Sequence, residues 1–252
     1  MKKSLGQHLL TDENYIHEII TSIPKNDKFA TLLELGPGMG ALTEHLLALD
    51  HPNLIHIELD DRFVSLLRKN FPQLKDSLIH ADFLKVDLNL ICKSPVCLVG
   101  NFPYNISSQI MFKVIENREI IQAGIGMFQK EVALRLTSAH GSKSYGILSV
   151  FLNAFYDTEL LFEIPPQAFR PPPKVVSAVI RFKRNDRKEL GCSEKLFRSV
   201  VKMAFAQRRK MLRNTLKLYL PYLDEEYHEK RPEHLSIDDY LKICNKIEAE
   251  NE

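Results

Sequence analysis

The chain has 252 residues, is 44% hydrophobic and carries a formal net charge of +2 at pH 7. This length suits one large domain, or one domain with a small appendage. No apolar run approaches the roughly 20 residues that a membrane helix needs, and the basic amino terminus lacks the apolar core of a signal peptide. We therefore expect a cytoplasmic protein with no membrane partner.

Cysteine and histidine positions give no sign of a metal centre. The four cysteines include no C-x-x-C pair, and the nine histidines form no H-E-x-x-H arrangement. Scattered thiols of this kind are typical of reduced, cytosolic proteins. We therefore expect no metal cofactor.

The first two-thirds of the chain alternates between strand-like and helix-like segments. Strands are predicted over residues 31–35, 54–58, 78–81, 96–100 and 123–128, with helices over 41–49, over about 62–70 and from about 107 onward. Strands separated by helices predict a parallel, doubly wound sheet. Two later β-rich runs, 158–164 and 175–182, flank a Pro-rich loop and are expected to complete the sheet as a hairpin-like pair.

The charged stretch Lys183–Lys188 interrupts this alternation and is interpreted as a linker, after which the periodicity is helical to the end. The expected fold class is α/β: a doubly wound, mostly parallel sheet with a small all-helical C-terminal domain. Residues 1–183 are predicted to form the first domain and residues 184–252 the second.

Polar residues follow several predicted strands, at the edge where ligands bind in an open α/β sheet. The segment Gly36–Gly40 comes directly after the first strand, and its glycines let the backbone approach a ligand at a helix amino terminus. Glu58 closes the second strand about 20 residues later, where an acid typically binds ribose hydroxyls. Asp82 closes the third strand, and with Phe83 it can bracket an adenine ring. Each feature alone could be a turn, a solvated strand end or a helix cap, whereas together they predict an adenosine-containing ligand.

The segment Asn101–Tyr104 follows the fourth predicted strand and has the sequence Asn-Phe-Pro-Tyr. This combination suits the task of holding a planar base and its exocyclic amine. Asn supplies an acceptor oxygen beside donors, Pro fixes the backbone, and Tyr offers a stacking face. Taken alone, the segment could equally be a Pro-containing turn with a partly buried Tyr.

The order of these motifs resembles that of the amino-methyltransferases that use S-adenosylmethionine. Further motifs sharpen the resemblance and extend along most of the chain: Gly6–Leu10, Gln129–Ala133, Ser144–Ser149, Ala168–Val175 and Phe205–Asn214. In this order they are similar to the ribosomal RNA adenine dimethyltransferase family, most closely to its bacterial small-subunit branch. Each motif alone is unspecific, whereas the set is highly specific.

The resemblance implies a Rossmann-like methyltransferase sheet with S-adenosylmethionine as the cofactor. The residues that match the family's cofactor contacts are His8, Leu10, Gly36, Glu58, Asp82 and Asn101. At two amino-terminal positions the chain differs from many members: His8 stands where Asn is frequent, and Leu9 where Phe is common.

The resemblance further implies a target adenine that is extruded into the site. Asn101 matches the residue that bridges cofactor and target amine, and Tyr104 and Phe169 match aromatics that stack on the base. Hydrogen bonds from the amine to the Asn101 side-chain oxygen and to a carbonyl near Phe102 or Pro103 would favour a pyramidal nitrogen that can attack the methyl group. No residue is identified as a base, so the proton is expected to leave to solvent. Without the resemblance, Phe169 would be interpreted as an aromatic that fills the core.

The segment Lys195–Lys217 contains eight basic residues and no acidic residue. Such asymmetry favours a polyanion over a membrane as the partner. A charge run is usually a solvated helix face, but the Gln207–Lys210 cluster has no acidic neighbour in the sequence, which favours RNA. The predicted RNA contacts are Lys202, Arg208, Arg209, Lys210 and Arg213.

The expected function is dimethylation of two adjacent adenosines near the 3′ end of small-subunit ribosomal RNA. The resemblance implies an assembling 30S subunit as the substrate, and we expect the enzyme to be a monomer. Two alternatives stay open: a large-subunit adenine methyltransferase of the macrolide-resistance type, and an RNA-binding assembly factor. The Ser144–Gly146 segment and the compact basic helix favour the small-subunit enzyme, and the intact Asn101–Tyr104 segment argues against pure loss of catalysis.

Overall fold

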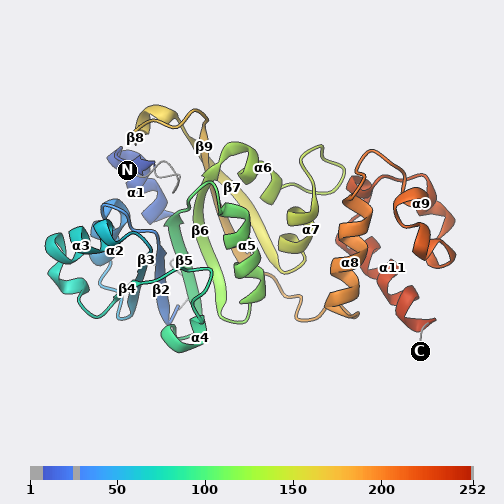
Figure 1. Cartoon of the computed structure of the whole chain (residues 1–252), viewed down its shortest axis with the longest axis horizontal. Helices are drawn as coiled ribbons and strands as arrows, with labels where there is room; N and C mark the ends of the chain where they lie inside the picture. The colour runs from blue at the N-terminus through green and yellow to red at the C-terminus, as the bar shows by residue number, and fades with distance from the viewer. Residues whose placement is uncertain (1–7, 25–28, 251–252) are drawn as a thin grey trace. The chain divides into compact units, whose positions relative to one another are not determined.

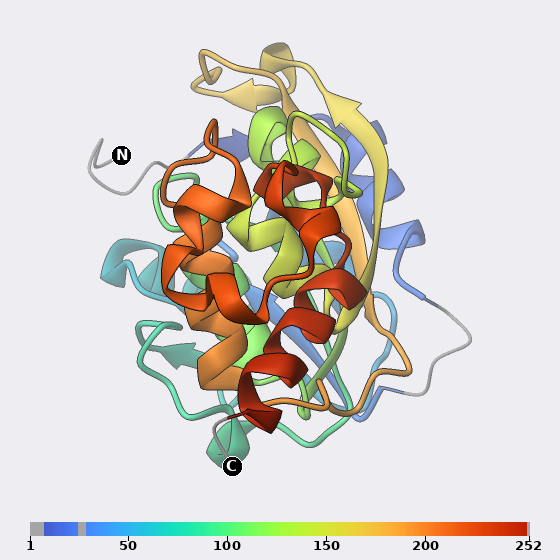
Figure 2. The same cartoon turned by 90° about the vertical axis from the view of Figure 1, so that its right-hand side faces the viewer.

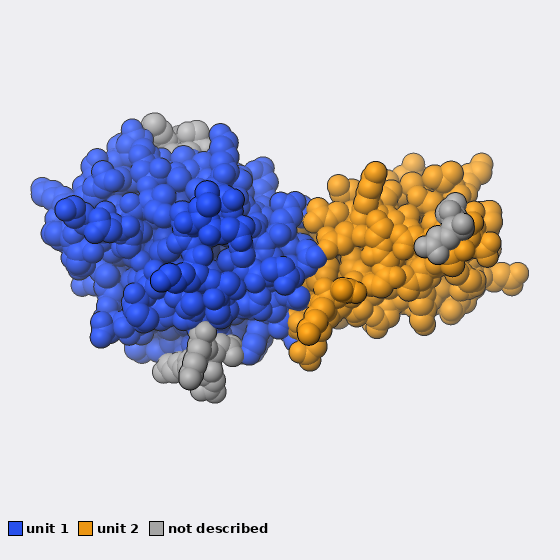
Figure 3. Space-filling model, turned by 90° about the horizontal axis from the view of Figure 1, so that it is seen from below, with its two compact units in different colours: residues 1–133, 157–184 blue, residues 134–156, 185–252 orange. Residues whose placement is uncertain are grey.

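The computed structural model describes residues 8–24 and 29–250, and the chain divides into two compact units. Unit 1 consists of residues 1–133 and 157–184, and unit 2 of residues 134–156 and 185–252 (Figure 3). Gly6 and Gln7, which belong to one of the family-like motifs, lie outside the described residues.

A seven-stranded sheet in the order β4-β3-β2-β5-β6-β9-β7 forms the centre of unit 1 (Figure 1). Its strands are β2 (Thr31–Leu35), β3 (Leu54–Glu58), β4 (Leu78–His80), β5 (Val96–Asn101), β6 (Ile121–Gln129), β7 (Tyr156–Ile164) and β9 (Ser177–Arg184). The strands from β4 to β6 pair in parallel, and β9 pairs antiparallel with β6. The expected α/β class and the mostly parallel sheet are confirmed, and β7 and β9 lie together at one edge as predicted.

Helices cover the sheet, so its central strands are buried on both faces; every residue of β2 is buried. Over one face, α1 (Glu13–Thr21) and α2 (Ala41–Leu47) share a single buried cluster with the sheet, including Ile16, Ile19, Leu42, Leu46, Val99, Ile125 and Val179. A smaller cluster joins α3 (Asp61–Asn70) and η2 (Pro72–Leu74) to β4. The helix α4 (Leu88–Ile91) precedes β5, and α5 (Ser107–Glu116) lies in front of the sheet in Figure 1.

A two-stranded sheet ties the start of the described chain to a distant loop. The strand β1 (Leu9–Leu10) pairs antiparallel with β8 (Phe169–Arg170), which follows η3 (Pro166–Ala168). The Thr11 N–H donates to the Ala168 carbonyl at 2.8 Å and extends this connection. Neither short strand was predicted from the sequence.

Apart from Tyr156, which begins β7, the regular elements in the described part of unit 2 are helical, and the helical prediction for the region after Lys188 is confirmed (Figure 2). Its elements are α7 (Ile147–Asn153), α8 (Glu194–Phe205), α9 (Leu212–Thr215), η4 (Lys217–Tyr222), α10 (Glu225–His228), η5 (Pro232–His234) and α11 (Ile237–Ala249), while α6 (Lys130–Leu136) crosses the division between the units. Aromatic contacts hold α7, α8 and α11 together: the Phe151 and Phe197 ring centroids are 5.9 Å apart, and those of Phe205 and Tyr240 6.4 Å.

The units differ from the predicted domains in one segment. Residues 134–156 belong to unit 2, whereas the sequence-based division placed them in the first domain. The physical reason is that Tyr145 and Phe151, both nearly fully buried, pack against aromatic side chains of α8. At the other boundary, Lys183 and Arg184 belong to β9, so the loop between the units starts after them. The division into a methyltransferase domain and an RNA-binding domain stays a prediction.

Candidate active site

A cavity of about 200 Å³ lies in unit 1, where the carboxyl ends of β2, β3, β4 and β5 meet. Parallel strands end at the same edge of a sheet, so side chains that are distant in sequence converge there. The sequence-predicted site residues that line the cavity are His8, Gly36, Glu58, Asp82, Asn101, Pro103 and Tyr104.

The glycine turn after β2 approaches the cavity with its backbone. Gly36 and Gly38 have φ angles of +67° and +59°, a region that glycine adopts without steric cost. The Gly36 N–H donates to the Ile57 carbonyl at 2.9 Å, which holds the turn beside β3. A Cβ atom on Gly38 would lie 3.2 Å from Leu9 Cδ2, so the bare glycine leaves room for Leu9 on the cavity wall.

Glu58 is nearly buried, with 6% of its surface exposed, and it accepts three backbone hydrogen bonds. The Gly38 N–H donates to Oε2 at 3.0 Å, and the Leu59 and Asp60 N–H groups both donate to Oε1 at 2.8 Å. Burial raises the pKa of Glu58 above the ordinary value for a glutamate, and the three N–H donors oppose that rise. The carboxylate is therefore held in one orientation, and Oε2 keeps a lone pair for an external hydroxyl donor.

A lysine side chain of α5 holds the loop that follows β4. Asp82 Oδ1 accepts the Leu84 N–H at 3.0 Å. The Lys113 ammonium donates to the Leu84 and Val86 carbonyls at 3.1 and 2.5 Å and lies 5.6 Å from the centroid of the Phe83 ring. Asp82 thus reaches the cavity from a loop whose position is set by a neighbouring helix.

The orientation of the Asn101 amide follows from a single contact. Its Nδ2 donates to the His8 carbonyl at 2.8 Å. Because a carbonyl oxygen can only accept, the nitrogen must face His8, and Oδ1 occupies the other position of the amide. The oxygen is therefore the atom that Asn101 can offer as an acceptor to a donor in the cavity.

Tyr104 is held on three sides. Its hydroxyl lies 2.5 Å from the Oγ of the fully buried Ser177, and its carbonyl accepts from Ser107 Oγ at 3.1 Å. The His8 imidazole stacks on its ring, with centroids 5.6 Å apart and planes at 25°. Burial raises the pKa of Tyr104, and the Ser177 hydrogen bond opposes the rise. Tyr104 thus offers a rigid neutral ring, of which one face is covered by His8.

Phe102 is a packing residue and not a stacking platform for a base. Phe102 is 1% exposed, and its ring meets the Phe128 ring edge-on, with centroids 5.1 Å apart. A Cβ atom on Gly100 or Gly126 would approach ring atoms of Phe102 to 2.8 or 2.6 Å, so both glycines make room for it. The Phe102 N–H also donates to the Met127 carbonyl at 3.2 Å. These contacts fix the backbone directly after Asn101 to β6.

Two predicted site residues lie in the core instead of on the cavity wall. Leu10 and Phe169, paired across β1 and β8, are 3% and 1% exposed and belong to the main apolar cluster. At the amino terminus it is Leu9 whose side chain lines the cavity. The burial of Phe169 agrees with the interpretation that its ring fills the core. Stacking of this ring on a base stays a prediction, and the buried position does not favour it.

Sequence reasoning missed several residues of the site. The cavity wall also includes Leu59, Asp60, Phe63, Leu84 and Ile106. Leu59 and Asp60 directly follow the predicted strand 54–58, so extending this strand-end motif by two residues would have found them. Ser177 is different, because nothing in the sequence relates it to Tyr104.

The basic segment is not one helix, and part of it has acidic partners. The Gln207–Lys210 cluster lies in a turn between α8 and α9. The Arg208 Nε lies 3.7 Å from Glu233 Oε2, and Arg213 Nη1 lies 3.3 Å from Glu229 Oε1. These carboxylates come from a later part of unit 2, which is why the local sequence gave no sign of them.

No group of three or more His, Cys, Asp or Glu side chains that could hold a metal ion occurs in residues 8–24 and 29–250. Within the same described ranges, no helix is both long and apolar enough to cross a membrane.

Comparison with known proteins gives matches over almost the whole chain. A family model described as ribosomal RNA adenine dimethylase matches residues 1–249. The chain is 50% identical over 248 residues to the ribosomal RNA small subunit methyltransferase A of Parabacteroides distasonis, covering 96% of this chain and 92% of the relative. It is 46% identical over 249 residues to the protein of the same name from Cytophaga hutchinsonii, covering 98% and 96%.

Solved structures share the fold. A dimethyladenosine transferase from Plasmodium falciparum superposes with a TM-score of 0.84 at 24% identity, covering 97% of this chain and 98% of the other. The 23S rRNA methyltransferase ErmE gives a TM-score of 0.71 at 21% identity, covering 95% and 99%. The expected Rossmann-like methyltransferase fold is thereby confirmed. With the family model spanning the strand-end cavity and the basic helical unit alike, the chain belongs to the ribosomal RNA adenine dimethylase family.

Proposed function

We propose that the protein transfers methyl groups from S-adenosylmethionine to the N6 amine of two adjacent adenosines in the 3′-terminal hairpin loop of small-subunit (16S) ribosomal RNA. The enzyme is a methyltransferase of the rRNA adenine dimethylase family, and the name of the 50% identical relative supports the small subunit as the source of the RNA. Its place of action is then the cytoplasm, on an assembling 30S subunit, where it acts as a monomer.

The residues at the cavity fit S-adenosylmethionine by the chemistry of their donors and acceptors. Glu58 would accept a ribose hydroxyl, Asp82 the adenine amine, and the apolar side chains of Leu59 and Phe83 would flank the adenine ring. The glycine turn would allow close approach at Gly36 and Gly38. When bound, this cofactor supplies an electrophilic methyl group on a sulfonium sulfur.

The observation that carries the proposal is the fixed amide of Asn101. Because His8 holds Nδ2, Oδ1 is positioned to accept one hydrogen of the target amine. The Pro103 carbonyl already accepts the Ile106 N–H at 3.2 Å, so the Phe102 carbonyl is the better acceptor for the second hydrogen. Two acceptors on one amine favour a pyramidal nitrogen, whose lone pair is then directed at the electrophile.

The residues at the site contribute by positioning and need not take up the proton. Well-oriented reactants can gain roughly 7–11 kcal/mol. Burial keeps the Tyr104 hydroxyl protonated at neutral pH, so it is no general base, and its ring serves to stack on the extruded adenine. The proton then leaves the methylated amine to solvent.

The test is methyl transfer from isotope-labelled cofactor to small subunits isolated from cells without this enzyme, followed by mapping of the modified nucleotides. We expect dimethylated adenosines at two adjacent positions near the 3′ end of the small-subunit RNA. Label in large-subunit RNA would favour the macrolide-resistance type instead, and binding without any label would favour an assembly factor.

A further inference from the structure

Two segments of unit 2 that are about 60 residues apart in sequence meet at Arg208. One is the loop between α6 and α7, residues 137–146, and the other is the turn between α8 and α9, residues 206–211. The Arg208 guanidinium donates to the Lys143 carbonyl through Nη2, while its Nε lies 3.7 Å from Glu233 Oε2. A planar guanidinium presents its N–H donors in a fixed fork, whereas a lysine ammonium is a point charge on a flexible stem.

The α6–α7 loop is fastened at further points. The Gly141 N–H donates to the Glu233 carbonyl at 2.6 Å, and Gly141 has a φ of +82°, which favours glycine there. Tyr145, at 2% exposed, inserts below the loop, with its ring centroid 6.3 Å from that of Phe205. The loop is therefore held against the end of α8 and against η5, and the hydrogen bond from Arg208 to the Lys143 carbonyl adds a further attachment.

The neighbouring cations differ from Arg208. Lys143, Arg209 and Lys210 are exposed, and none has a carboxylate within 4.0 Å in the part of the chain that the structure describes. Arg208 is 39% exposed, and the nearby Glu233 carboxylate, at 16%, offsets its charge. Two adjacent arginines thus have opposite surroundings: Arg208 is engaged inside the unit, and Arg209 has its charge available to an external anion.

We propose that the α6–α7 loop and the α8–α9 turn form one RNA-phosphate-binding surface, in which Lys143, Arg209 and Lys210 contact phosphates and Arg208 is a positioning residue that holds the loop of Lys143. This inference depends on the proposed function in one respect, which is that the ligand is RNA. It adds Lys143 to the predicted contacts and removes Arg208 from them. Phosphate contacts release counterions, so their number can be measured from the salt dependence of binding.

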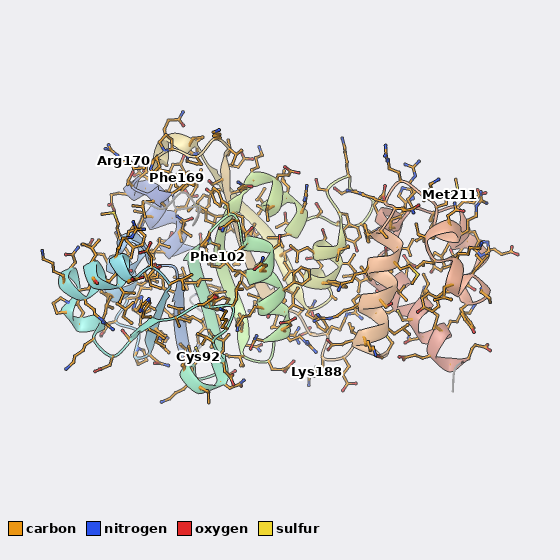
Figure 4. All side chains as sticks on the ribbon, in the orientation of Figure 1. Cys92, Phe102, Phe169, Arg170, Lys188 and Met211 are labelled. Atoms are coloured by element: carbon orange, nitrogen blue, oxygen red, sulfur yellow. The ribbon has the colours of Figure 1, made fainter. Side chains whose placement is uncertain are left out.

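The first experiment measures binding of a fluorescent RNA hairpin with two adjacent loop adenosines at several salt concentrations. We expect Arg209→Ala and Lys143→Ala each to reduce the slope of log affinity against log salt by about 0.7–0.9. Lys188→Ala is the matched control, because Lys188 is an exposed lysine on the loop that leads into α8, at the end of that helix opposite to Met211 (Figure 4). We expect no change of slope in this control.

The second experiment separates positioning from charge. In the Arg208→Ala background, we expect Lys143→Ala to have little further effect on RNA binding, because the loop is already released. The effects of Arg209→Ala and Lys143→Ala should instead add. Arg208→Lys keeps the charge but lacks the planar fork, so we expect it to behave like Arg208→Ala.

Hydrogen exchange gives a readout without RNA. We expect Arg208→Ala to speed exchange of the Gly141 amide by about tenfold, and Arg209→Ala to leave it unchanged. Full rescue of binding by Arg208→Lys, with additive effects of Arg208→Ala and Lys143→Ala and unchanged Gly141 exchange in Arg208→Ala, would overturn the proposal. Failure of methyl transfer to small subunits would refute the proposed function instead, and it would leave these exchange and salt results as they are.

Discussion

The polar side chains in the cavity of unit 1 are fixed by hydrogen bonds within the protein, whereas those on the basic surface of unit 2 are exposed. In the cavity, Glu58 and Asn101 are fixed by hydrogen bonds to the backbone before any ligand arrives. On the basic surface, Arg209 and Lys210 are exposed and have no carboxylate partner among the described residues. The first arrangement suits directional recognition of a small molecule and a base, whereas the second suits attraction to a phosphate chain, as proposed above. Substitutions in unit 1 should therefore change chemistry and those in unit 2 should change salt dependence.

The largest effect is expected for Asn101→Ala, which removes the acceptor for the target amine. We expect methyl transfer to fall by at least about 100-fold, since even a small misplacement of reacting groups has such an effect. RNA binding should stay unchanged, which a salt titration with the RNA hairpin checks. Asn89→Ala, on the exposed surface of α4, is the control. Full methylation by Asn101→Ala would disprove the role given to Oδ1.

The next effect separates the ring of Tyr104 from its hydroxyl. Tyr104→Ala removes a stacking face worth about 1–3 kcal/mol, so kcat/KM should fall by roughly 5- to 150-fold. Tyr104→Phe keeps the ring but loses the bond to Ser177, worth about 1 kcal/mol, and should lower kcat/KM by about fivefold. If Ser177 acts only through this bond, Ser177→Ala should have no further effect in the Tyr104→Phe enzyme. Equal losses for the Ala and Phe variants would rule out stacking by this ring.

Glu58→Gln is expected to weaken binding of S-adenosylhomocysteine by about tenfold, as measured by titration calorimetry. The reason is that the glutamine amide nitrogen would face backbone N–H groups that now donate to a carboxylate oxygen. Glu13→Gln changes a side chain that is 77% exposed and should have no effect. Unchanged affinity in Glu58→Gln would place the ribose contact elsewhere.

The raised pKa of Glu58 gives the same residue a pH signature. Because the folded-state pKa lies above the unfolded one, its contribution to stability is fully present below the ordinary glutamate pKa and is lost as pH rises through the raised value. Ligand affinity has the opposite dependence, since hydroxyl donors need the ionised form, and it should fall as pH drops through the raised pKa. The unfolding free energy of the wild type relative to Glu58→Gln should therefore fall as pH rises through the raised pKa, as denaturant unfolding measures. Calorimetry should show the fall in ligand affinity at low pH in the wild type and not in Glu58→Gln.

The smallest effects are expected in unit 2. Lys202 is exposed on α8 without a carboxylate partner in the described residues, whereas Arg213 is paired with Glu229 at 3.3 Å. Lys202→Ala should reduce the salt slope of RNA binding by about 0.7–0.9, and Arg213→Ala by less. Equal losses would mean that the surface pair with Glu229 is too weak to matter, as many exposed pairs are.

The sheet and the strand-end residues of the site could be predicted because their signals are local. Buried runs such as Val96–Gly100 mark the strands, and parallel strands bring their carboxyl ends together. From this alone, Glu58, Asp82 and Asn101 were expected at one place, and all three line the cavity. Their chemistry needed only residue type and position along a strand.

Features that depend on distant pairing could not be predicted in this way. The β1–β8 pairing turns Leu10 and Phe169 toward the core, and no local pattern encodes a contact between residues so far apart. The partners of Arg208 come from the α6–α7 loop and from η5, so the sequence around it read as an unpaired charge cluster. The placement of residues 134–156 in unit 2 was missed for a related reason, since no local pattern shows that Tyr145 and Phe151 pack on α8.

The connection of His8 to Pro171 also sets an order of events during synthesis. His8 Nδ1 lies 2.9 Å from the Pro171 carbonyl, and the two residues are 163 positions apart. A ribosome that adds about 5–20 residues per second needs roughly 8–30 s to cover that interval. Once Asn101 has been added, the nascent chain carries this residue and its strand for the rest of this time. It then still has no completed β1–β8 pair to hold His8 over Tyr104. The amino-terminal wall of the cavity is therefore among the last parts of unit 1 to be completed, although it is among the first to be translated.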